Sequence, residues 1–203
     1  AMDVMVDEAT EDISIMGAVN PSEKTYFETS VFSHAKNRFL WLLILMLSST
    51  ITGTIITQYE NAFAAIPLLV SFIPMLMDTG GNCGSQSSTL IIRGLALDEI
   101  RFKDIFRVIF KEFRVALLVS LGLALANGLR IFIMYKDLKL AVVIGLSLIC
   151  TVILSKIIGC ILPLFAKKIN LDPAIMAAPL ITTLVDTCSI IIYFTIATHI
   201  FQL

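Results

Sequence analysis

Five long apolar runs separated by short polar segments dominate the sequence. The hydrocarbon core of a bilayer is about 30 Å thick, so a helix needs about 20 residues to cross it. All five runs reach that length. They cover approximately Phe39–Gln58, Ala62–Ala96, Phe106–Met134, Leu138–Ala166 and Ala174–Phe201. The pattern therefore predicts an all-α membrane protein with five transmembrane helices.

Prolines fall inside or near three of these runs. Pro67 and Pro74 favour a kink in the second run, and Pro163 and Pro179 favour kinks in the fourth and fifth. The second and third runs are longer than one crossing requires, which allows tilt, a kink or an extension beyond the bilayer.

Composition agrees with a membrane environment. Of the 203 residues, 57% are apolar, and the mean hydropathy is +0.90, whereas soluble domains are about 45–50% apolar. The net charge is −1 from 15 basic and 16 acidic residues, so no nucleic-acid partner is indicated. The four cysteines share no Cys-x-x-Cys spacing, and we expect buried, inert thiols.

Basic residues near the ends of the apolar runs predict the orientation, because Lys and Arg are enriched in cytoplasmic loops. They precede the first run, separate the second from the third, and follow the fourth. These residues are Lys36, Arg38, Arg93, Arg101, Lys103, Arg107, Lys111, Arg114, Lys167 and Lys168. We therefore expect a multi-pass protein of the cell membrane with a cytoplasmic N-terminus and an extracytoplasmic C-terminus. Arg130, Lys136 and Lys139 lie on the opposite side and are exceptions.

Residues 1–38 differ from the rest of the chain because they are polar and acidic and show no cleavable signal peptide. Pro21-Ser22-Glu23 is typical of a helix N-terminus. We expect a soluble, cytoplasmic connecting helix over residues 22–38 that leads into the first span.

Two carboxylates lie inside apolar runs, where an ionisable group is costly and usually functional. Helical spacing places Asp78 on one face with Asn82, with Ser85 or Gln86, and with Thr89. Asp186 follows Thr182 and Thr183 by about one helical turn. Such oxygen-rich sites without histidine or paired thiolates favour a hard cation that keeps its water, as Mg²⁺ does.

The glycines near Asp78 have two interpretations. Gly80, Gly81 and Gly84 could turn carbonyl groups toward an aqueous lumen, or they could simply let helices pack closely. The polar side chains beside these glycines likewise have two interpretations: they could bind an ion, or they could form hydrogen bonds between helices.

One chain has only five predicted spans and supplies Asp78 and Asp186 once each. A pore on a two-fold axis would double the ligands, so we expect a homodimer that contains Asp186 and its counterpart at the axis.

Several segments resemble the MgtE family of magnesium channels and transporters, over practically the whole chain. Ala9-Thr10-Glu11-Asp12-Ile13 is similar to the end of that family's CBS domain. Gly80-Gly81-Asn82, Gly84, Gln86 and Arg93-Gly94-Leu95-Ala96 resemble its second-helix signature. Asp172-Pro173-Ala174 and Leu184-Val185-Asp186 resemble its fifth helix.

The resemblance implies three parts of the chain. Residues 1–21 are expected to be a remnant of a cytosolic CBS domain, residues 22–38 the connecting or plug helix, and residues 39–203 the five-helix pore domain.

The resemblance also implies passive, selective Mg²⁺ transport through a dimeric pore lined by the second and fifth helices, with hydrated ion held at Asp186. The backbone near Thr182 would contribute water-mediated contacts, and Asn82 would lie on the partner pore helix. Asp172 matches an acid near the cytoplasmic mouth. Regulatory Mg²⁺ is expected at the acids Glu8, Glu11 and Asp12.

The chain departs from the family pattern at two positions. Ala178 stands where one family pore has asparagine, and Asp78 stands where that pore lacks an acid. Most of the family's sensing region is absent from this sequence, so we expect Mg²⁺-dependent closure to be weakened.

Other functional classes fit less well. An exchanger coupled to H⁺ or Na⁺ could use Asp78 or Asp186 as a relay, and sequence alone does not separate it from a channel. Asp78-Thr79-Gly80 also resembles half of an aspartic-protease motif, but no Gly-x-Gly-Asp motif of the membrane proteases is present. A purely structural membrane subunit is the remaining alternative. We expect a transporter and not an enzyme, with the bilayer and divalent cations as its partners.

Overall fold

The computed structural model describes residues 10–21, 25–176 and 178–202, and it is built from helices without a strand among them. Five helices are long. They are α2 (Val31–Gln58), α4 (Ile73–Ala96), α5 (Ile105–Tyr135), α6 (Leu138–Lys168) and α7 (Ala178–Phe201). The expected all-α architecture is confirmed.

Four of the described helical segments are long and apolar enough to cross a membrane: Val31–Gln58, Phe102–Tyr135, Leu138–Lys168 and Pro173–Phe201. Helix α4 has 24 residues, about 36 Å at 1.5 Å per residue. It is long enough to cross but contains more glycine and polar residues than the others. The chain is a multi-pass membrane protein in which α4 is the least apolar of the five long helices.

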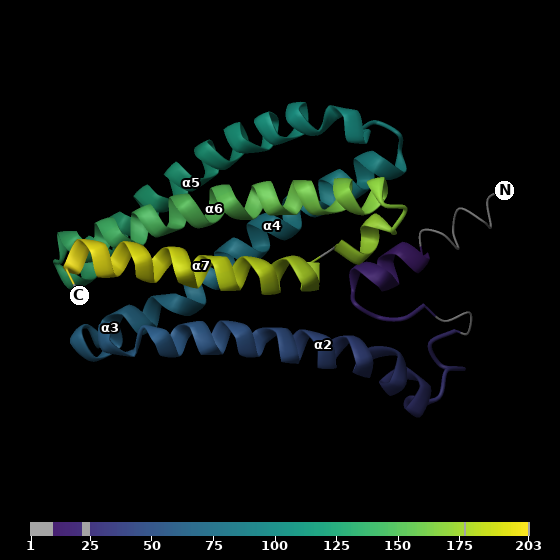
Figure 1. Ribbon diagram of the computed structural model, residues 1–203, viewed down its shortest axis with the longest axis horizontal. Helices are drawn as coiled ribbons and strands as arrows, with labels where there is room; N and C mark the ends of the chain where they lie inside the picture. Colours follow the sequence, from purple (N-terminus) through teal and green to yellow (C-terminus); the bar gives the residue numbers. More distant parts are fainter. Residues whose placement is uncertain (1–9, 22–24, 177, 203) are drawn as a thin grey trace.

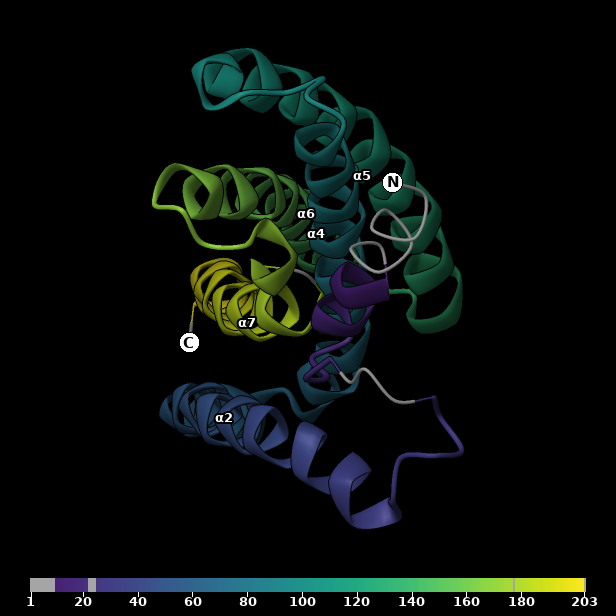
Figure 2. The ribbon, with the colours of Figure 1, turned by 90° about the vertical axis from the view of Figure 1, so that its right-hand side faces the viewer.

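Helix α6 occupies the centre of the bundle and contacts α4, α5 and α7. Helix α4 packs across both α6 and α7, and α2 packs along α7. The long helices run roughly along one axis, with α4 inclined to α6 and α7 (Figure 1). Figure 2 shows α5 arching along the outer side of the bundle, where it packs on α6.

The second predicted span, over residues 62–96, is interrupted near its start. The chain forms α3 (Glu60–Ala65), a 3₁₀ helix η1 (Pro67–Phe72) and then α4. Pro67 and Pro74 occupy first-turn positions, where a missing N–H costs nothing and φ is already set for a helix. The expected kink is therefore a change of helix at Ile66.

The other two prolines also differ from a simple kink. Pro179 lies in the first turn of α7, after the 3₁₀ helix η3 (Pro173–Met176), so it lies where the helix begins. Pro163 lies inside α6, which continues through it as one helix.

The predicted connecting helix over residues 22–38 is shorter in the structure. Residues 22–24 lie outside the described part, and Thr25–Glu28 form a turn. Helix α2 begins at Val31, where the Ser30 hydroxyl accepts a hydrogen bond from the Ser33 N–H. The described start of the predicted connecting segment is thus a turn, and its end is continuous with the first long helix.

A large apolar core fills the end of the bundle near the α5–α6 loop. It includes fully buried Leu69, Leu76, Ile144, Tyr193 and Phe194. The buried Tyr193 hydroxyl donates to the Leu69 carbonyl at 2.9 Å, which satisfies its polar end. This core fixes η1 and the start of α4 against α7.

Candidate functional site

One face of α4 carries exposed oxygen-bearing side chains. Asp78, Asn82, Gln86 and Thr89 are all exposed, as their spacing of about one turn predicts. A carboxylate and two amides on lipid-facing surface would be very unfavourable. This face therefore requires water or another polar surface beside it.

The opposite face of α4 consists of small residues in close contact with other helices. A Cβ atom on Gly80 would lie 2.9 Å from Val185 Cγ1, and one on Gly81 would lie 2.9 Å from Thr182 Cγ2. A Cβ on Gly84 would lie 2.7 Å from Ile181 Cγ2. Real Cβ atoms do not approach this closely, so these glycines allow α4 to pack directly on α7. The packing interpretation holds for all three.

This contact brings the two intramembrane carboxylates together. Asp186, on α7, is partly exposed and directly follows Val185, which packs against Gly80. The contacts of Gly81 with Thr182 and of Gly84 with Ile181 show that α4 and α7 run antiparallel here. Asp78, before Gly81, therefore lies on the same side of this contact as Asp186, after Thr182. Like charges held near each other in a membrane protein make a site that favours a cation.

Threonines accompany Asp186 on α7. The hydroxyls of Thr182 and Thr183 both donate to the Pro179 carbonyl, each at 3.0 Å. Their protons are therefore used within the helix, and lone pairs on the oxygens remain available to accept hydrogen bonds from water. Thr182 also contacts Gly81, so it lies at the junction of α4 and α7.

The remaining predicted site residues lie elsewhere. Asp172 precedes η3, and its carboxylate accepts a hydrogen bond from the Ala174 N–H at 2.8 Å, as a capping residue does. Glu11 and Asp12 belong to a short N-terminal helix. Glu8 lies outside the described residues. Among the described residues, neither Asp172 nor the acids Glu11 and Asp12 join Asp78 and Asp186 in a larger cluster.

No three His, Cys, Asp or Glu side chains of the described part of the chain lie together as a metal-ligand set. Two carboxylates with amides and hydroxyls nearby are suited to an ion that keeps its water.

The sequence analysis missed a second polar cluster, on the buried side of α4. The Ser87 hydroxyl donates to Glu112 Oε2 at 2.6 Å, and Lys156 Nζ donates to the Ser87 oxygen at 3.3 Å. Lys156 and Glu112 also form an ion pair at 3.9 Å. All three are buried. The sequence did contain a signal for this cluster, because Glu112 lies inside the apolar run 106–134 and Lys156 lies inside the run 138–166.

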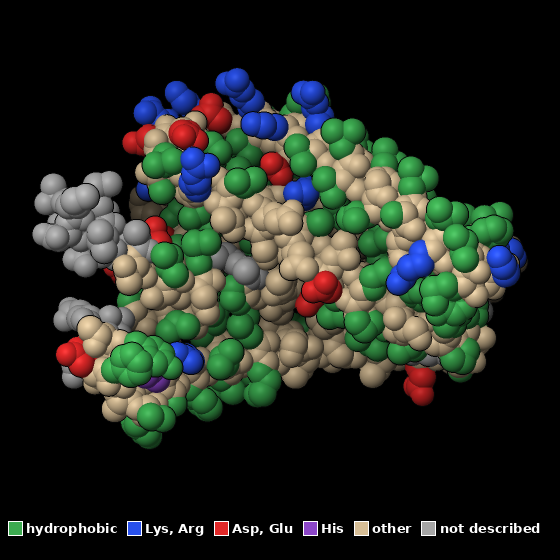
Figure 3. Space-filling model, turned by 180° about the vertical axis from the view of Figure 1, so that it is seen from behind, with side chains coloured by type: hydrophobic (Ala, Val, Ile, Leu, Met, Phe, Trp, Pro, Cys, Tyr) green, Lys and Arg blue, Asp and Glu red, His purple; other side chains and the backbone are tan. Residues whose placement is uncertain are grey.

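Charged side chains gather toward the end of the molecule that carries the α4–α5 loop (Figure 3). Much of the remaining face is apolar side chain or backbone. The pattern agrees with a polar membrane border at that end.

Comparison with known proteins gives consistent relatives. The family model MgtE, described as divalent cation transporter, matches residues 73–196. Proteins named magnesium transporter MgtE from Thermus thermophilus and Bacillus subtilis are 37% and 36% identical to the chain. One of the same name from Enterococcus faecalis is 30% identical.

Each of these alignments covers 97% of the chain but 43% of the relative, so the chain spans less than half the length of these relatives. The family match spans α4 to α7 and contains Asp78, Asp186 and the glycines that join their helices. The chain belongs to the MgtE family of divalent cation transporters, which are not enzymes.

Proposed function

We propose that this chain is the membrane part of a passive, selective transport protein for Mg²⁺. It works as a homodimer with a pore lined by α4 and α7, and a hydrated ion is held at Asp186. The observation that carries the proposal is the close α4–α7 contact at Gly81 and Thr182, which brings Asp186 near Asp78 and the exposed oxygens of α4.

The chemistry of this face suits Mg²⁺. The ion loses its water slowly and binds through few carboxylates while keeping several waters. Asp186 and Asp78 would supply the negative charge, and Asn82, Gln86, Thr182 and the nearby Thr183 would bind the water shell. The names of the relatives support Mg²⁺ as the ion transported.

A second copy of the chain would complete the pore. In one chain, the Asp78 face of α4 is exposed, and such a face cannot contact lipid. A two-fold axis beside it would place two Asp186 carboxylates around one aqueous path and remove the polar face from the bilayer. The Asn82→Cys variant, in a protein whose four native cysteines are replaced, would test this proximity. The yield of disulfide cross-linking between two copies of the chain is the measurement.

The orientation and the N-terminal acids complete the proposal. The basic α4–α5 loop is cytoplasmic, with the N-terminus on the same side and the C-terminus outside. Residues 1–21 are a remnant of a cytosolic CBS domain, residues 22–38 are the connecting segment, and Glu8, Glu11 and Asp12 contribute to regulatory Mg²⁺ sites. Asp172 lies near the cytoplasmic mouth, where its capping role leaves one carboxylate oxygen free to attract cations.

The test is Mg²⁺ uptake into liposomes that contain the protein, under a Mg²⁺ gradient. We expect Asp186→Ala to abolish uptake. The matched control is Asp98→Asn, which removes an exposed carboxylate in the α4–α5 loop and should leave uptake unchanged. Equal uptake by wild type and Asp186→Ala would remove Asp186 from the transport path.

A coupled exchanger is the second candidate, because an intramembrane carboxylate such as Asp78 or Asp186 can act as a relay for H⁺ or Na⁺. The same liposomes separate it from a passive pathway. Uptake that follows the Mg²⁺ gradient without an opposing H⁺ or Na⁺ gradient supports passive transport. Uptake that stops when those gradients are removed supports exchange.

A further inference from the structure

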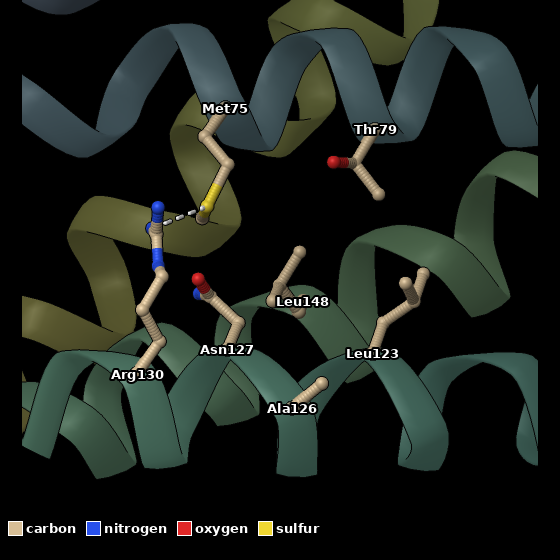
Figure 4. Close-up of a pocket in the computed structure, with 7 residues that line it drawn as sticks. All are labelled: Met75, Thr79, Leu123, Ala126, Asn127, Arg130 and Leu148. Carbon is tan, nitrogen blue, oxygen red and sulfur yellow. Dashed lines mark hydrogen bonds between the residues drawn. The ribbon is translucent and has the colours of Figure 1, made fainter. Parts of the chain in front are cut away.

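A cavity of about 380 Å³ lies beside α4 and has no lining residue from α7, the helix that carries Asp186. Three helices form it. Its lining residues are Met75, Thr79, Leu123, Ala126, Asn127, Arg130 and Leu148 (Figure 4). Helices α4 and α5 diverge here, and α6 forms the floor. None of these residues belongs to the proposed ion path.

The polar groups of the cavity are hydrogen-bond donors without an acid to pair with. Arg130 Nη2 approaches Met75 Sδ at 3.6 Å, a weak acceptor, and no carboxylate of the described residues forms an ion pair with Arg130. The Asn127 Nδ2 atom is buried and has no hydrogen-bond partner there. A guanidinium and an unsatisfied amide on neighbouring turns of α5 make a site for an anion, in particular a phosphate.

Depth along α5 separates the polar end of the cavity from its apolar end. Arg130 lies five residues before Tyr135, the last residue of α5, or about 8 Å along the axis. Leu123 lies twelve residues before Tyr135, or about 18 Å. Figure 4 shows Arg130 and Asn127 toward one end and Leu123 toward the other. The donors therefore lie near headgroup depth, and the apolar lining continues into the hydrocarbon region.

We propose that this cavity binds one anionic phospholipid from the leaflet on the side of the α5–α6 loop. Its phosphodiester accepts hydrogen bonds from Arg130 and Asn127, and an acyl chain lies over Leu123, Ala126 and Leu148. This occupant satisfies the buried amide, neutralises the cation and fills the apolar end. A free phosphate would do the first two only.

The site has a direct connection to α4. Met75 and Thr79 line the cavity one turn apart, and Thr79 is adjacent to Asp78 on the neighbouring face of the same helix. A bound lipid would therefore fill the space between α4 and α5, where the two helices otherwise make little contact. It would also account for an arginine on the side of the membrane that the charge distribution leaves poor in basic residues.

The experiment is native mass spectrometry of the purified, delipidated protein titrated with phosphatidylglycerol, phosphatidylcholine or inorganic phosphate. Arg130→Gln removes the cation, and Arg130→Lys keeps it. Ala126→Phe fills the apolar end without changing charge. Lys139→Gln is the matched control, because it removes an exposed cation near the same loop but outside the cavity. Elution on size exclusion confirms that each variant is folded.

We expect one phosphatidylglycerol to be retained per chain, with retention at least tenfold weaker in Arg130→Gln and Ala126→Phe. Arg130→Lys should retain it in part, and Lys139→Gln should match wild type. Equal retention of phosphatidylcholine and phosphatidylglycerol would overturn the proposal, as would unchanged retention of phosphatidylglycerol in Arg130→Gln. A structure of the dimer in which a second copy of the chain fills the cavity would also overturn it. Inorganic phosphate that competes fully, with Ala126→Phe unaffected, would show a phosphate site and overturn the lipid assignment.

Discussion

The two faces of α4 carry polar residues in opposite circumstances. On the exposed face, Asp78, Asn82 and Gln86 form no hydrogen bond to a described residue. On the buried face, Ser87 bonds to both Glu112 and Lys156, and Ser88 donates to the Met176 carbonyl at 2.8 Å. Both faces interrupt an apolar pattern, yet the oxygens of the first remain available and those of the second are used.

The difference shows how to interpret polar residues in a membrane helix. Intramembrane charge is expected to be functional by default, but Glu112 and Lys156 satisfy each other and join α5 and α6 to α4. The structural cluster differs from the candidate ion site because its polar groups have hydrogen-bond or ion-pair partners within the protein. Charge alone does not distinguish the two. The buried face should therefore control stability, and the exposed face should control transport.

Breaking the buried ion pair should have the largest effect on stability. Glu112→Ala leaves Lys156 buried without its counter-charge, which costs about 3–5 kcal/mol in comparable cases. We expect a clear fall in the melting temperature in detergent. The double variant Glu112→Leu with Lys156→Met should recover much of that loss, because no buried charge remains. A double variant as unstable as Glu112→Ala would show that the pair has another role.

Widening the α4–α6 contact should have the next largest effect. A Cβ atom on Gly159 would collide with the Gly84 backbone carbonyl, so Gly159→Ala should destabilise the protein by about 1–3 kcal/mol through overpacking. Gly122→Ala is the matched control, because nothing lies within 4 Å of its added Cβ. It should be neutral or slightly stabilising. Equal melting temperatures for the two variants would contradict the close crossing.

The sequence predicted the long helices well because each apolar run is long enough to cross a bilayer. It failed where a local signal competed with the run. Pro67 begins a separate 3₁₀ helix inside the second run, and Ser30, not the Pro21-Ser22-Glu23 segment, caps α2. In both cases the sequence offers two possible helix starts close together, and hydropathy does not show which of them is used.

The candidate site was predictable one helix at a time. Helical spacing placed Asp78 with Asn82, and Asp186 with Thr182, but it could not place α4 against α7. That contact depends on glycines whose partners are far away in the chain. For the same reason the Ser87–Glu112–Lys156 cluster was missed, since each member comes from a different helix.

A hydroxyl contact between α2 and α7 should have a smaller effect. The Thr52 and Thr187 hydroxyls lie 2.7 Å apart, and Thr52 is buried on a helix that is otherwise largely exposed. Thr52→Val keeps the shape and removes the bond, which should cost about 1 kcal/mol. Thr54→Val is the control, because that exposed hydroxyl bonds within its own helix. No difference between the two would show that α2 is held by other contacts.

Removing Asp78 should affect stability least while still slowing transport. Its side chain is exposed and has no hydrogen-bond partner to lose, and the α4–α7 contact places its negative charge on the same side as that of Asp186. Asp78→Asn should therefore leave the free energy of unfolding unchanged within about 0.5 kcal/mol, or raise it slightly. Liposomes should show a few-fold lower Mg²⁺ uptake, because one of the two carboxylates beside the ion is gone. Asp137→Asn is the matched control for stability, since that carboxylate accepts the Leu140 N–H at 3.0 Å where α6 begins, a role that asparagine can also fill. If Asp78→Asn lowered stability and left uptake unchanged, the exposed face of α4 would be structural, and the contrast between its two faces would be lost.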